Sequence, residues 1–230
     1  MRTFLLAIFA AVALASPASA ATRNFGVESF TKIRVDGPFK VTLSTGVPPF
    51  ARATGSTNGL DRVAVEIQGQ TLVIRSQDSW GGYPGTDLGP VEVSVGTHDL
   101  ASATLNGAGS ITIDRVKGLT FALSLQGSGS GQIGDVAIDQ MSVSLVGSAN
   151  AKLTGHAGKL TALVRGISSL DAAALTTPNA QISADGTSTV DANVTDTAKV
   201  AGWGPATIRL AGRPSCTVKT SGSTSVSGCR

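Results

Sequence analysis

The sequence predicts an all-β protein, a right-handed parallel β-helix whose coils are 18–20 residues long. Two observations carry this prediction. Glycines recur at a nearly constant spacing in the C-terminal half, and apolar residues alternate with polar ones on both sides of each glycine. The composition agrees, because aromatic residues make up only 4% of the chain and 28 residues are glycine. Such a composition suits many short strands that are joined by tight turns.

The first element, residues 1–20, has the three regions of a secretory signal peptide. A charged start at Arg2 is followed by an apolar run over residues 4–14 and by a tail of small residues that ends at Ala20. The apolar run is shorter than the roughly 20 residues that a membrane-spanning helix needs. We therefore expect cleavage after Ala20 and an exported protein, either periplasmic or secreted to the cell surface.

Residues 21–100 read as a β-strand region without the regular glycine spacing. Turn residues, such as Asn58-Gly59 and Gly69-Gln70, separate runs in which apolar and polar residues alternate. The alternating apolar residues are Ile33 and Val35; Phe39, Val41 and Leu43; Val63, Val65 and Ile67; Leu72 and Ile74; and Val91, Val93 and Val95. We expect these strands to form the first coils or a cap, because a bare solenoid end exposes strand edges.

Residues 76–90 interrupt this pattern with the segment SQDSWGGYPGTDLGP, which predicts a projecting loop. The segment carries Trp80 and Tyr83, the only tyrosine of the chain. Trp and Tyr offer a large contact area at a low entropic cost, so this pair is a candidate ligand-binding platform. The alternative is that both rings fold back over the solenoid.

Residues 101–230 contain the repeats. Seven anchor glycines follow one another at intervals of 20, 20, 19, 20, 18 and 18 residues and predict about seven coils. These glycines are Gly107, Gly127, Gly147, Gly166, Gly186, Gly204 and Gly222.

Apolar residues occupy fixed positions relative to each anchor. Two residues before the first four anchors stand Leu105, Leu125, Leu145 and Val164. Four residues before the seven anchors stand Ala103, Leu123, Val143, Ala162, Ile182, Val200 and Val218. This period of two places one set of side chains on one face of a strand. A single coil cannot bury such a face, whereas stacked coils cover one another.

One outward column contains four charged residues in consecutive coils. Five residues after the anchors the sequence has Thr112, Gln132, Lys152, Asp171, Asp191, Arg209 and Ser227. If the coils stack in register, Lys152 lies beside Asp171, and Asp191 lies beside Arg209. This arrangement is either a ladder of surface ion pairs or an acidic pair, Asp171 and Asp191, with a role in cation binding or catalysis.

Cys216 and Cys229 are the only cysteines. In an exported protein such an isolated pair predicts a disulfide, here one that closes the last coil. Removal of Arg2 with the signal peptide leaves 17 basic and 15 acidic residues, a net charge of +2. The basic residues are scattered, which argues against a nucleic-acid partner. No ligand pattern that would hold a metal or another cofactor surrounds His98 or His156.

Several short motifs stand out along the chain: the opening FTKIRVDGPFKV over residues 30–41, NGLD over 58–61, GQTLVI over 69–74, VEV over 91–93 and the bend LNGAG over 105–109. These motifs resemble those of a known family, the head GIN domain of auto-transporter adhesins. The resemblance covers most of the chain after residue 20. It implies an exported β-helix with a role in adhesion or surface interaction, and it implies no catalytic residues.

These observations favour a non-catalytic envelope protein that binds a polysaccharide or another cell-surface component. The first alternative is a carbohydrate-active β-helix enzyme, either a lyase or a hydrolase. It would use Asp171, Asp185 and Asp191 together with Arg165, all expected near one another across adjacent coils. The second alternative is a structural protein that self-associates through the ends of the solenoid.

Overall fold

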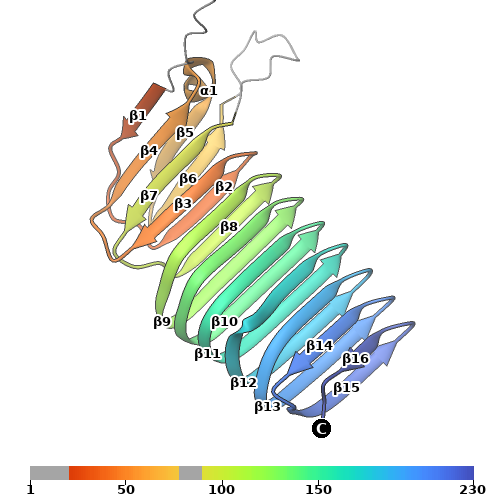
Figure 1. The fold of residues 1–230 in the computed structure, drawn as a ribbon. Coiled ribbons are helices and arrows are strands. Elements are labelled where there is room, and N and C mark those ends of the chain that lie inside the picture. Colours follow the sequence, from red (N-terminus) through yellow and green to blue (C-terminus); the bar gives the residue numbers. More distant parts are fainter. Residues whose placement is uncertain (1–20, 78–89) are drawn as a thin grey trace, which may run out of the picture.

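The computed structural model describes residues 21–77 and 90–230 and shows a β-solenoid of about six turns (Figure 1). Strands account for 74% of the residues and helix for 3%, which confirms the predicted all-β fold. The coils wind in the right-handed sense, as parallel strand connections nearly always do. The number of turns, about six, is slightly lower than the expected seven coils.

Five long, bent strands form the middle of the stack. They are β9 (Ser110–Gly127), β10 (Ser130–Gly147), β11 (Asn150–Gly166), β12 (Ser169–Asp185) and β13 (Thr189–Trp203). Each begins after one corner glycine, bends at the opposite edge of the solenoid and returns to the next corner glycine (Figure 1). The coil is therefore flattened into two faces.

We call face A the sheet that contains the first part of each long strand, together with β14 (Thr207–Ala211) and β16 (Ser225–Ser227). Face B contains the last part of each long strand, together with β8 (Ser102–Gly107) and β15 (Ser215–Ser221). Residues just after a corner glycine thus belong to face A, and residues just before one belong to face B.

The register of the strands confirms the predicted apolar columns. Leu105 aligns with Leu125 and Leu125 with Leu145, and the column continues through Val164 and Ala184. The five side chains have no solvent-exposed surface. The second predicted column is also aligned, and it is buried at Ala103, Leu123, Val143, Ala162, Ile182 and Val200. Its last member, Val218, aligns with Val200 but is exposed, because within the described residues no further coil covers it. Each coil covers the apolar side chains of its neighbours, so one core runs along the stack.

A column of glycines with positive φ makes the corner between the two faces. Its members are Gly37, Gly107, Gly127, Gly147, Gly166, Gly186, Gly204 and Gly222. At Gly147 φ is 103°, and a Cβ atom there would lie 2.6 Å from the carbonyl oxygen of Gly127 in the preceding coil. Both the backbone conformation and the close approach of the next coil therefore require glycine.

The N-terminal strands extend both sheets. On face A the order is β1 (Ala21–Phe25), β4 (Phe50–Gly55), β7 (Glu92–Thr97) and β3 (Lys40–Thr45), and β3 then pairs with β9. On face B the order is β5 (Val63–Gln68), β6 (Thr71–Ser76) and β2 (Lys32–Asp36), and β2 then pairs with β8. The pairs β1–β4, β4–β7 and β5–β6 are antiparallel, unlike the rest of the stack.

The short helix α1 (Thr57–Asp61) lies at this N-terminal end and buries Leu60 in the core. Arg23 of β1 holds the helix in place, since it donates a hydrogen bond of 3.0 Å to the Leu60 carbonyl and forms an ion pair of 2.7 Å with Asp61. Antiparallel strands and a helix thus close this end. No helix of the described chain is long and apolar enough to cross a membrane.

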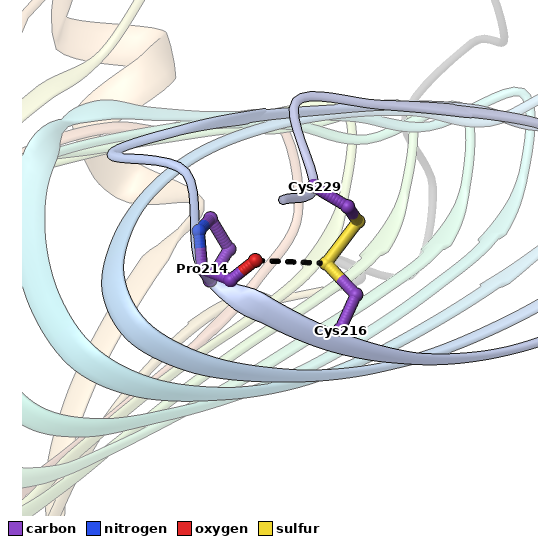
Figure 2. Close-up of a disulfide and its surroundings, with 3 residues drawn as sticks. All are labelled: Pro214, Cys216 and Cys229. Atoms are coloured by element: carbon purple, nitrogen blue, oxygen red, sulfur yellow. Dashed lines mark hydrogen bonds between the residues drawn. A yellow bond between two sulfur atoms is a disulfide. The ribbon is translucent and has the colours of Figure 1, made fainter.

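The C-terminal end contains the predicted disulfide between Cys216 and Cys229 (Figure 2). It joins β15 to the residues that follow β16. The amide of Arg230 donates to the Pro214 carbonyl at 3.1 Å, which holds the tail against the start of the last coil. Within the described residues no strand pairs with the outer edge of β15 or β16, and Val218 is 43% exposed. This end is therefore more open than the N-terminal one.

Candidate functional site

The aromatic pair that the sequence singles out, Trp80 and Tyr83, lies outside the residues that the structure describes. Its role in ligand binding stays a prediction. The described residues contain two other surfaces with functional side chains, one on each face of the solenoid.

Face A carries the charged column as predicted. Lys152 aligns with Asp171, Asp171 with Asp191, and Asp191 with Arg209. The Lys152 Nζ lies 3.7 Å from Asp171 Oδ2, and Arg209 donates from Nη2 to Asp191 Oδ2 at 2.8 Å. The hydrogen bond with Asp191, reinforced by its negative charge, raises the pKa of Arg209 above its ordinary value. Each carboxylate is thus matched by a cation in the adjacent coil.

The expectation that Asp185 and Arg165 lie near Asp171 and Asp191 is wrong. Asp185 stands immediately before Gly186, so its outward side chain belongs to face B, where it aligns with Arg165. Asp171 and Asp191 follow their corner glycines and belong to face A. Because the glycine corner folds the chain between the two faces, the three carboxylates do not converge on one site.

Metal-binding groups are equally dispersed. Across residues 21–77 and 90–230, no three or more His, Cys, Asp or Glu side chains gather closely enough to hold a metal ion. His98 follows β7 and His156 lies within β11, and both are exposed.

Face B has a hollow of about 440 Å³ over the last coils, lined by β12, β13 and β15. Its outward side chains are Gln181, Ser183, Lys199, Ala201, Trp203 and Lys219. Ala201 explains the depression, because its methyl group stands between the long side chains of Lys199 and Trp203 on the same strand. Ser183 beside it in the preceding coil is also short. The volume lies within the range of about 300–1,000 Å³ that is usual for ligand sites.

Trp203 forms one end of this hollow. Its side chain is 47% exposed and lies between Asp185 of the preceding coil and Ser221 of the following one. A tryptophan normally buries most of its large apolar surface, so half-exposed indole in a hollow is a candidate contact surface. The position of Trp203 in the repeat already indicates that its side chain points outward. Trp203 directly precedes Gly204, at the position where Asn106 and other polar residues point outward.

A second hollow, of about 280 Å³, continues the first along the strands. The two share Gln181 and Lys199, and the second also includes Lys159, Asn179 and Thr197. We call the two together the face B groove. Lys199 and Trp203 are four residues apart on one strand, a separation of about 13 Å at 3.3 Å per residue. The groove therefore has room for an extended ligand that lies along the strands.

Residues 29–214 match the model of the family described as "Putative auto-transporter adhesin, head GIN domain". The comparison with curated proteins gave no match.

Several solved structures share the fold. A putative adhesin from Bacteroides fragilis is 18% identical, with a TM-score of 0.82 over 91% of this chain and 97% of the other. A putative adhesin from Parabacteroides merdae and a putative lipid binding protein from Parabacteroides distasonis are each 18% identical, with TM-scores of 0.68 over 90% of this chain and 95% of theirs. At this identity the likeness shows the shared fold.

Proposed function

The chain belongs to the family of auto-transporter adhesin head GIN domains, and we propose on that basis that it is an exported, non-catalytic envelope protein that binds polysaccharide. Family membership supports a binding role at a surface, and the signal-peptide pattern of residues 1–20 supports export. The ion pairs of Asp171 with Lys152 and of Asp191 with Arg209 support the absence of catalysis, since both adjacent carboxylates of face A already have cationic partners in neighbouring coils.

The observation that carries the proposal is the half-exposed indole of Trp203 in the face B groove. The C–H face of a sugar ring packs on such a flat apolar surface. Its hydroxyl groups would find hydrogen-bonding partners in Gln181 and Ser183 along the same groove. The extended shape of the groove matches a polysaccharide chain better than a single compact ligand.

We expect Trp203→Ala to weaken polysaccharide binding at least tenfold, because exposed tryptophans at the centre of a binding site cost about 2 kcal/mol or more when truncated. A glycan array identifies ligands of the wild type, and titration calorimetry then measures the dissociation constants of both proteins. Val146→Ala is the matched control, since Val146 occupies the same outward column of face B, is 39% exposed and lies outside the groove. Equal affinities of the Trp203→Ala variant and the wild type would contradict the proposal for the groove.

Trp80 and Tyr83 are a second proposed contact for the polysaccharide. A Trp80→Ala/Tyr83→Ala double variant distinguishes their contribution to binding from that of Trp203. Loss of binding in this variant alone would place the ligand on the segment 76–90. Loss in both variants would indicate one ligand that contacts both regions.

A second candidate function is self-association, which the open C-terminal end favours. Within residues 21–77 and 90–230 the outer edges of β15 and β16 are unpaired and Val218 is half-exposed, so this end can offer strand pairing to another copy. We expect light scattering to show a mass that rises with protein concentration, and Val218→Lys to suppress the rise by placing a charge at the edge. A constant monomer mass in the wild type would contradict this role.

A further inference from the structure

In the part of the chain that the structure describes, the lysines that border the face B groove form no ion pair with an acidic residue. The described residues contain seven ion pairs, and none of them includes Lys159, Lys199 or Lys219. All three side chains are exposed and line the two hollows. Their positive charges are therefore available to a ligand.

Face A shows that this solenoid does pair its charges where no ligand is expected. Lys40 is paired with Glu92, Lys152 with Asp171, and Arg209 with Asp191, each across adjacent strands. The same stacking would allow an acidic residue beside each groove lysine. Instead Lys159 faces Asn179, Lys199 faces Gln181 and Thr217, and Lys219 faces Ala201.

The three lysines follow a diagonal across the groove. Lys199 and Lys219 lie on adjacent strands two residues out of register, a Cα separation of about 8 Å from the strand spacing and rise. Lys159 lies two strands from Lys199 on the other side, at a Cα separation of about 12 Å by the same geometry. The positive charges are thus spread over the groove at intervals of about 8 and 12 Å, and such a spacing suits a ligand with repeated anionic groups.

Two acidic residues lie near the ends of the groove. Asp185 stands beside Trp203, and Asp196 precedes Thr197 at the bend. Neither forms an ion pair with a groove lysine in the part of the chain that the structure describes. Between these two residues the groove therefore carries the positive side chains of the lysines, and the indole of Trp203 lies at one end.

We infer that the ligand of the groove is an anionic polysaccharide, whose carboxylate or sulfate groups contact Lys159, Lys199 and Lys219 while a sugar ring packs on Trp203. This inference rests on the proposed function and specifies its ligand class. It requires that binding depend on the charge of the chain, on the groove lysines and on ionic strength, since salt screens exposed charges.

The test uses polygalacturonate and its fully methyl-esterified form, which share a sugar backbone and differ in charge, together with dextran sulfate and neutral dextran. We expect the wild type to bind the acidic chains at least tenfold more tightly than the neutral ones at low salt. The variant Lys199→Gln/Lys219→Gln should lose most of this difference. The control variant Lys32→Gln/Lys117→Gln removes the same amount of positive charge outside the groove, and it should retain the difference in affinity between acidic and neutral chains. All four side chains point into solvent, so folding is preserved, which circular dichroism verifies.

Three results would overturn the inference. Equal binding of neutral and acidic chains, with loss of both in Trp203→Ala, would leave the proposed polysaccharide site in place and remove its charge preference. Binding of vesicles that contain phosphatidylglycerol, dependent on Lys199 and Lys219 and without binding of the acidic chains, would assign the lysines to lipid headgroups. No binding of any acidic chain would remove the ligand class altogether.

Discussion

Replacement of Gly147 by alanine should lower the free energy of unfolding by about 2–5 kcal/mol. A residue with a Cβ atom costs about 1–2 kcal/mol in a left-handed conformation, and φ of Gly147 is 103°. The added methyl group would also lie 2.6 Å from the Gly127 carbonyl oxygen, and overpacking of this kind costs about 1–3 kcal/mol. Urea denaturation followed by circular dichroism measures the loss.

Three further glycines separate the two causes. Gly26 has no positive φ and no atom within 4 Å of an added Cβ, so Gly26→Ala should leave the stability unchanged. Gly46→Ala tests the cost of the backbone conformation alone, because φ of Gly46 is 74° and no atom lies within 4 Å of an added Cβ. Gly109→Ala tests the steric contact alone, with a Cβ 2.5 Å from the Phe39 carbonyl oxygen. If Gly147→Ala is no less stable than Gly26→Ala, the stability of the coil does not depend on glycine at the corner.

Loss of the disulfide should release the last coil without unfolding the rest. The bridge closes a loop with a sequence separation of 13, and constraint of such a loop is worth about 3 kcal/mol in the chain-entropy model. Because β15 and β16 are covered on one side only, Cys216→Ser/Cys229→Ser should destabilise these strands first.

Hydrogen exchange with mass spectrometry checks this result. We expect faster exchange in β15 and β16 and unchanged protection in β9 and β10. Wild-type protein treated with a reductant should behave in the same way, which separates loss of the bridge from the effect of the new serines. Uniformly faster exchange along the whole chain would show instead that the solenoid unfolds as one cooperative unit.

The register of the repeats could be predicted because two periodicities coincide. The glycine spacing equals the length of one coil, and the alternation around each glycine separates inward from outward side chains. Alignment of the anchors therefore placed Leu105, Leu125 and Leu145 in one column and Lys152 beside Asp171, as the structure shows.

Other features depend on contacts that a linear repeat does not contain. Gly37 joins the glycine column although 70 positions separate it from Gly107, so no spacing indicates it. Asp185 was grouped with Asp171 because their short sequence distance hides the change of face at the corner between them. The position of Trp203 directly before Gly204 predicts that its side chain points outward. The hollow beside it could not be predicted, because it arises from Ala201 and from side chains of neighbouring coils.

The position of β2 and β3 in the two sheets has a consequence for the order of folding. Strands of the repeats pair with partners about 20 residues away, whereas Lys40 aligns with Ser110, 70 positions later. Closing the longer loop costs about 1 kcal/mol more in chain entropy. As the chain is synthesised, residues 32–45 have no parallel partner until residues 71–113 follow. The N-terminal strands therefore depend on longer loop closures than the repeats, and we expect their pairing to form more slowly.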